Sequence, residues 1–91
     1  MNREELTAKN IVWITDPGHG WLRIPKEELK GFTPSPYSYE GQGHVYLEED
    51  CDAPGWLRHV SLLPEAARGL PEQYSDGDSF VRRLTSCSTA W

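Results

Sequence analysis

Four carboxylates and one thiol stand together in the run Glu48-Glu49-Asp50-Cys51-Asp52, and this combination could bind a metal ion or host a nucleophile. A twelve-residue calcium loop that starts at Asp50 needs an acid at its fifth position and a glutamate at its twelfth. Those positions hold Pro54 and Ser61, so the calcium motif fails. Nucleophilic chemistry at Cys51 needs a thiolate, which the neighbouring carboxylates disfavour. We expect the run to serve neither chemistry.

Zinc is the other metal that the residue types suggest, because the chain has two cysteines and three histidines. Cys51, Cys87, His44 and His59 show neither the Cys-x-x-Cys nor the His-x-x-x-His spacing of typical zinc sites. We therefore predict that the protein holds no metal and no other cofactor. Both cysteines are expected to be free, partly buried thiols, since a reducing compartment prevents a disulfide.

A second string with catalytic potential is the segment Ile14-Thr15-Asp16-Pro17-Gly18-His19-Gly20. It resembles the first zinc-ligand motif of N-acetylmuramoyl-alanine amidases. The resemblance implies that His19 binds zinc and that zinc-bound water attacks an amide. Glu27 or Glu28 and His44 would have to supply the other ligands, although no motif matches them to those roles. The resemblance covers seven residues, and Trp21 replaces the glycine that follows the motif in that family. We favour a structural turn here and keep a zinc-dependent cell-wall hydrolase as the alternative.

Charge is distributed unevenly along the chain. Residues 38–78 hold nine acids against two basic residues, a net charge of −7, whereas the whole protein has a net charge of −5. Such a balance disfavours DNA or an anionic membrane as a direct ligand. Carboxylates on a rigid surface can instead imitate the phosphates of a duplex and attract a groove lined by Lys and Arg. The simpler interpretation is an acidic surface that only keeps the protein soluble.

The elements that position these residues are predicted from length and pattern. A chain of 91 residues with four tryptophans and four tyrosines is long enough for one core and too short for two. No apolar run approaches the roughly 20 residues of a membrane span, and the N-terminus lacks the apolar stretch of a signal peptide, so we expect a cytoplasmic protein. Residues 1–9 are expected to be a flexible lead-in, and residues 10–91 a single domain.

Within that domain the pattern predicts two hairpins. Strands at 11–15 and 21–24 flank the turn at 16–20, and strands at 37–39 and 44–47 flank the loop at 40–43. Pro25 and Gly31 bracket a short helical segment between them.

The C-terminal half is predicted to be less regular. Apolar spacing between residues 53 and 68 indicates a helix that Pro64 divides, with Asp52 as its N-cap. A loop follows over 69–77, and residues 79–85 fit a strand or a helix. The sum is an α+β fold with a small antiparallel sheet of about four to five strands and one or two short helices.

Longer strings carry a further resemblance. The segments Trp13–Leu22, Tyr37–Tyr39 and Val45–Asp52 resemble a family of small uncharacterised proteins carried on bacterial phages and mobile elements. That family brings no established chemistry. In size and acidity the chain is also similar to small acidic anti-CRISPR proteins of type I systems, some of which imitate DNA. This second resemblance implies a binding function and assigns no binding residue.

We therefore predict a phage-encoded inhibitor that mimics DNA and blocks the nucleic-acid-binding groove of a host CRISPR surveillance complex. Its partner would be a basic Cas subunit of a type I complex, and it would act by occupancy and not as an enzyme. An acidic accessory protein of a mobile element is a further alternative. The residues predicted to bind Lys or Arg of the partner are Glu40, Glu48, Glu49, Asp50, Asp52, Asp76 and Asp78.

Overall fold

Strands β1 and β2 form the first hairpin that the sequence predicts. In the computed structural model, which describes residues 2–87, β1 spans Val12–Thr15 and β2 spans Gly20–Pro25. The strands are antiparallel, with Ile14 opposite Trp21. Their β-branched and aromatic residues favour this pairing, and Pro17 and Gly18 occupy the turn between them.

A second hairpin joins β3 (Tyr39–Gly41) to β4 (His44–Glu48), and β4 also pairs with β2. Gln42 and Gly43 connect the two strands with φ angles of 54° and 81°, the positive values that a tight two-residue hairpin turn requires. Strand β3 begins later than the predicted strand at 37–39, so Tyr37 belongs to the preceding loop.

Two short strands complete the sheet. β5 (Glu72–Tyr74) runs parallel to β1, and β6 (Thr85–Ser86) runs antiparallel to β3, which gives the order β5-β1-β2-β4-β3-β6. The predicted α+β class is confirmed, but the sheet has six strands and is mixed. The residues of β5 are all exposed and show no apolar alternation, which explains why the sequence predicts a loop there.

Helical segments connect the strands. They are the α-helices α1 (Arg3–Ala8) and α2 (Asp52–His59) and the 3₁₀ turns η1 (Lys26–Leu29), η2 (Pro64–Ala67) and η3 (Phe80–Arg83). The helical segment after Pro25 and the interruption before Pro64 agree with the sequence. Residues 79–85, predicted as strand or helix, contain η3 and the first residue of β6.

The N-terminal segment differs from its prediction as a lead-in. The side chain of Asn2 accepts a hydrogen bond from the Glu5 N–H, which caps α1, and Leu6 is fully buried in the core. The cap and the buried leucine hold this segment against the core. Its charged composition gives little sign of either contact.

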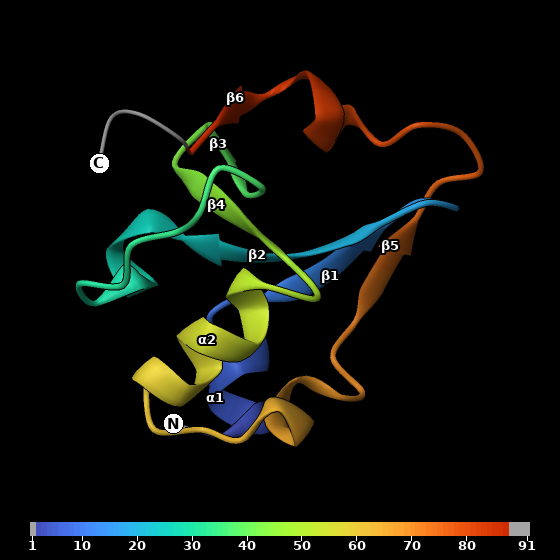
Figure 1. Cartoon of the computed structure of the whole chain (residues 1–91). Coiled ribbons are helices and arrows are strands. Elements are labelled where there is room, and N and C mark those ends of the chain that lie inside the picture. Colours follow the sequence, from blue (N-terminus) through green and yellow to red (C-terminus); the bar gives the residue numbers. More distant parts are fainter. Residues whose placement is uncertain (1, 88–91) are drawn as a thin grey trace.

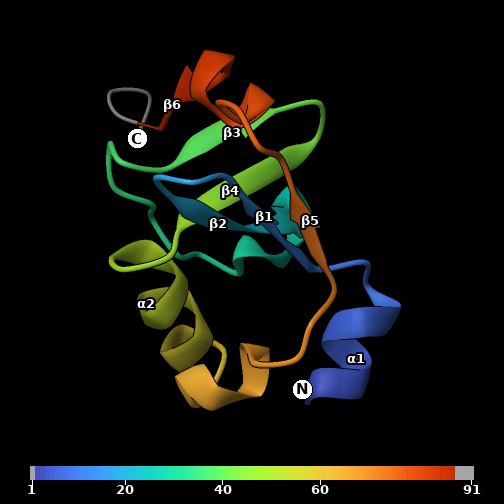
Figure 2. The ribbon, with the colours of Figure 1, turned by 90° about the vertical axis from the view of Figure 1, so that its right-hand side faces the viewer.

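Apolar side chains cover both faces of the sheet, as the alternation along each strand requires. On one face, Leu22 and Leu47 belong to the same buried cluster as Trp56 of α2. On the other face, Trp21 packs with Val81 of η3. Figures 1 and 2 show this arrangement, with α1 and α2 on one side of the sheet, the segment that contains η3 on the other, and β6 at the edge beside β3.

None of the helices in residues 2–87 has the length and hydropathy that a membrane span requires. Residues 88–91 of the predicted domain lie outside the described residues.

Candidate functional site

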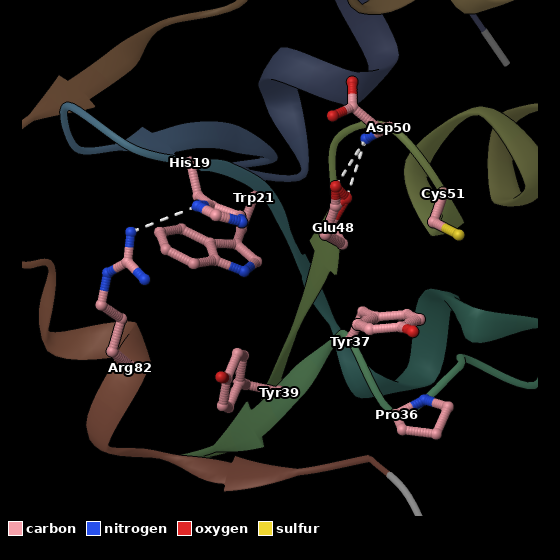
Figure 3. A pocket seen from close by; sticks show the side chains of 9 residues that line it. All are labelled: His19, Trp21, Pro36, Tyr37, Tyr39, Glu48, Asp50, Cys51 and Arg82. Atoms are coloured by element: carbon pink, nitrogen blue, oxygen red, sulfur yellow. Dashed lines mark hydrogen bonds between the residues drawn. The ribbon is translucent and has the colours of Figure 1, made fainter.

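A hollow of about 330 Å³ opens on the side of the sheet that η3 covers (Figure 3). Its first wall is formed by His19, Trp21 and Arg82. Tyr37, Tyr39 and Pro36 form the second wall, and Glu48, Asp50 and Cys51 form the third. We call this hollow the tyrosine–carboxylate pocket.

Asp16 holds the first wall in place. Its Oδ1 accepts hydrogen bonds from the backbone N–H groups of Gly18 and His19, each at 2.9 Å, and its Oδ2 accepts one from Ser79 at 2.9 Å. The Arg82 guanidinium donates to both carboxylate oxygens, from Nε at 2.8 Å and from Nη2 at 3.0 Å. The hydrogen bond from Arg82, assisted by these backbone donors, holds the pKa of Asp16 well below its usual range despite burial. The Asp-Pro-Gly-His-Gly string is thus a turn that fastens η3 to the sheet.

The bound Arg82 in turn organises two aromatic rings. Its guanidinium carbon lies 5.4 Å from the ring centroid of Trp21, a cation–π contact, and its Nη2 lies 3.3 Å from Nδ1 of His19. The His19 ring stacks on Trp21 with centroids 5.9 Å apart, and Tyr39 meets Trp21 edge-on. The pocket is therefore preorganised on this side.

Asp52 is buried and supports the tyrosine wall, so its prediction as a partner-binding residue is wrong. It is only 6% exposed and is the first residue of α2, whereas Cys51 is the N-cap. Its Oδ2 accepts hydrogen bonds from the N–H and hydroxyl of Ser35 and from the hydroxyl of Ser38. Ser38 Oγ also accepts the Glu48 N–H at 3.0 Å. Asp52 therefore ties the loop that carries Tyr37 to the end of β4, and presents no carboxylate to a partner.

Two other members of the predicted set also have internal partners. Glu48 is 8% exposed, and both its carboxylate oxygens accept the Asp50 N–H at 3.0 Å. Glu40 is half-buried and forms a salt bridge with Lys26 at 2.8 Å. Glu48 still lines the pocket, but neither residue adds to a freely exposed acidic surface.

The remaining carboxylates gather at one end of the sheet. Glu48, the last residue of β4, lies opposite Trp21, and β5 ends beside Thr15. The segments that follow β4 and β5 therefore both emerge next to the β1–β2 turn. We define the acidic end as five exposed acidic residues, four from the predicted set and Glu72 of β5. They are Glu49, Asp50, Glu72, Asp76 and Asp78.

The charges of the acidic end are mostly uncompensated. Partial desolvation, followed by the charges of Asp50, Glu48 and Glu72, raises the pKa of Glu49 above its ordinary value. Among the described residues, only Asp78 of this group contacts a basic side chain, that of Arg82 at 3.9 Å. That contact is weak because Asp78 is 85% exposed. The carboxylates of Glu48, Asp50 and Glu72 thus lie close enough to raise the pKa of Glu49, against an opposing contribution from His19.

The zinc ligands of the amidase alternative are not brought together. His19 precedes β2, whereas Glu28 follows it and His44 lies opposite Pro25, at the far end of the same strand. Glu28 is also bound by Lys9 at 3.1 Å. Within residues 2–87 no group of three or more His, Cys, Asp or Glu side chains is arranged to hold a metal ion.

The cysteines are both free thiols, as predicted, but their environments differ. Cys51 is exposed at the rim of the pocket, and Cys87 is 1% exposed in the core. Burial raises the pKa of the Cys87 thiol to about 11. Figure 3 shows Cys51 and His19 on opposite sides of the pocket, so the two do not form a nucleophile–base pair.

Three important pocket residues were absent from the predicted set: Trp21, Tyr37 and Arg82. Trp21 and Tyr37 stand out in the sequence only as two of many aromatics, and Arg82 is 66 residues from the aspartate that binds it. Searches against protein-family models, curated proteins and solved structures find no match to this chain.

Proposed function

We propose that this protein is an acidic binding protein that occupies the basic, nucleic-acid-binding groove of a partner protein. The observation that carries the proposal is the acidic end, where Glu49, Asp50 and Glu72 bring exposed carboxylates together and form no salt bridge among the described residues. Such an arrangement has a cost in self-repulsion, which a row of Lys and Arg on a partner would relieve.

Binding of this kind is governed by long-range electrostatics. Complementary charge accelerates association, and the effect weakens as salt screens it over about 10 Å at 0.1 M ionic strength. Because a DNA-binding groove is lined by cations that neutralise phosphates, a rigid acidic surface competes with DNA for the same groove. The proposal requires occupancy alone and no chemical step.

The resemblance to proteins of phages and mobile elements makes the proposal more specific. We infer an inhibitor of a host defence system, with a Cas subunit of a type I CRISPR surveillance complex as the partner. Target DNA would then be excluded from the complex for as long as the inhibitor is bound.

The first test is affinity capture with the tagged protein from a bacterial host that carries a type I system. We expect subunits of the surveillance complex to be retained, and we expect an excess of target duplex DNA to release them. Retention of no nucleic-acid-binding protein would contradict the proposal. Formation of a ternary complex with unchanged DNA affinity would contradict it equally.

A further inference from the structure

The tyrosine–carboxylate pocket contains a donor that has no acceptor. The indole N–H of Trp21 is buried and forms no hydrogen bond within residues 2–87, and the residue as a whole is only 1% exposed. The two other tryptophans of residues 2–87 are satisfied, since Trp13 donates to the Ala67 carbonyl at 3.0 Å and Trp56 to the Glu28 carbonyl at 2.8 Å. An unsatisfied buried donor destabilises a fold, so its retention points to an acceptor supplied from outside.

Figure 3 shows where that donor lies. The nitrogen edge of the Trp21 indole faces the space between Glu48 and the two tyrosines. Glu48 is the cross-strand neighbour of Trp21, so an acceptor at the indole sits directly beside a carboxylate. A ligand for this pocket must therefore combine an acceptor with a cationic or donor-rich group.

The charge and shape of the pocket favour a ligand that also carries a cationic group. Glu48 and Asp50 line the pocket, and among the described residues neither forms a salt bridge. The one guanidinium in the wall, that of Arg82, is neutralised by Asp16. Tyr37 is 68% exposed at the rim and offers a flat aromatic face. Carboxylates beside an exposed aromatic ring suit a planar guanidinium, which both stacks and donates several hydrogen bonds.

The size of the pocket suits a ligand about as large as one amino-acid residue. Its volume of about 330 Å³ lies at the small end of the range for ligand sites. An arginine residue supplies a guanidinium and, through its own main chain, a carbonyl acceptor. The first and second walls are held by hydrogen-bond networks around Asp16 and Asp52, so little ordering is needed on binding.

We propose that the pocket binds an arginine side chain of the partner protein, with Glu48 and Asp50 accepting from the guanidinium and the Trp21 indole N–H donating to a main-chain carbonyl. The inference rests on the proposed function for its choice of a basic protein as partner. It adds a specific anchor to the diffuse attraction of the acidic end.

The test is a titration of the ¹⁵N-labelled protein with N-acetyl-arginine-N-methylamide, followed by NMR at the tryptophan indole N–H signals. We expect the Trp21 signal to shift saturably while those of Trp13 and Trp56 stay in place. The matched probe N-acetyl-norleucine-N-methylamide, which has the carbonyls without the guanidinium, should leave all three unchanged. Inorganic phosphate is the anionic control and should also leave the Trp21 signal unchanged.

Two variants separate a specific site from general acidity. Asp50→Asn removes a carboxylate from the pocket, whereas Glu49→Gln removes one from the adjacent position outside it. We expect Asp50→Asn to weaken binding of the arginine probe by about fivefold or more, because a charged hydrogen bond becomes neutral, and Glu49→Gln to weaken it by less than about twofold.

Three results would overturn the inference: no shift of the Trp21 signal with the arginine probe, a shift with phosphate instead, or equal weakening by the two variants. These results are distinguishable from failure of the proposed function. Capture of a partner that DNA releases, together with a silent arginine titration, would remove the pocket assignment alone. A specific arginine titration without any captured partner would remove the proposed function alone.

Discussion

The carboxylate of Asp16 and the guanidinium of Arg82 form a two-point salt bridge, with N–O distances of 2.8 and 3.0 Å, between the β1–β2 turn and η3. The side chain of Asp16 is fully buried, whereas that of Arg82 is 32% exposed. One contact therefore closes the outer layer over the sheet and shapes one wall of the pocket.

Removal of the Asp16 carboxylate should destabilise the fold. We expect Asp16→Ala to lower the free energy of unfolding by roughly 3 kcal/mol, because it leaves Arg82 and buried backbone donors without an acceptor. Urea unfolding followed by tryptophan fluorescence measures this change. Asp78→Ala is the matched control, since it removes the exposed contact to the same Arg82 and should cost less than about 0.5 kcal/mol. Equal effects of the two substitutions would show that the buried contact is not special.

The Asp16–Arg82 salt bridge should make the free energy of unfolding depend on pH in one direction. In the folded state the pKa of Asp16 lies below its ordinary value of 3.8, so the stabilisation is complete above pH 3.8 and decreases as the pH falls below it. The free energy of unfolding should be measured at a series of pH values for wild type and Asp16→Asn. The difference between the two proteins should be large at neutral pH and become small toward low pH. A constant difference at every pH would contradict this assignment.

Replacement by alanine should destabilise the fold at Asp52 and leave its stability almost unchanged at Asp50. Asp52→Ala removes the acceptor of Ser35 and Ser38 and should lower the free energy of unfolding by about 2–4 kcal/mol, because those buried donors lose their partner. Asp50→Ala changes an exposed side chain and should stay within about 0.5 kcal/mol of wild type. Comparable stabilities of the two variants would show that Asp52 does not hold the tyrosine loop.

The two thiols should differ in reactivity. We expect a disulfide reagent such as 5,5′-dithiobis(2-nitrobenzoate) to modify Cys51 rapidly in the native protein at pH 8, because it is exposed. Cys87 is buried with a pKa of about 11 and should react only on unfolding. Cys51→Ser should abolish the fast phase. Two fast equivalents in the wild-type protein would contradict the core position of Cys87.

The strands of the two hairpins could be predicted from sequence because their information is local. Strand periodicity marks β1, β2 and β4, and glycine-containing turns separate them. Strand β5 could not be predicted, since its three exposed residues pair with β1 only because the chain returns to that edge. Its parallel direction also depends on this long-range return.

The candidate site was predicted only in part for the same reason. A charge count cannot tell the buried pair Glu48 and Asp52 from the exposed pair Glu49 and Asp50. The difference arises from tertiary contacts, since Ser38 bonds to Asp52 and to the Glu48 N–H. The pocket depends on Arg82, which reaches the first wall from the far end of the sequence. No local pattern carries that contact.

The acidic end is proposed to compete with DNA for a basic groove. Competition between the protein and target duplex DNA for a purified type I surveillance complex tests it most directly, with wild type compared to the reversal variant Glu49→Lys, Asp50→Lys, Asp76→Lys. The matched control, Glu4→Lys, Glu27→Lys, Glu65→Lys, makes the same change in net charge at exposed residues of α1, η1 and η2. We predict that wild type and control displace DNA, increasingly weakly as salt rises, and that the folded reversal variant does not. Equal displacement by the reversal variant and the control would show that the acidic end does not compete with DNA.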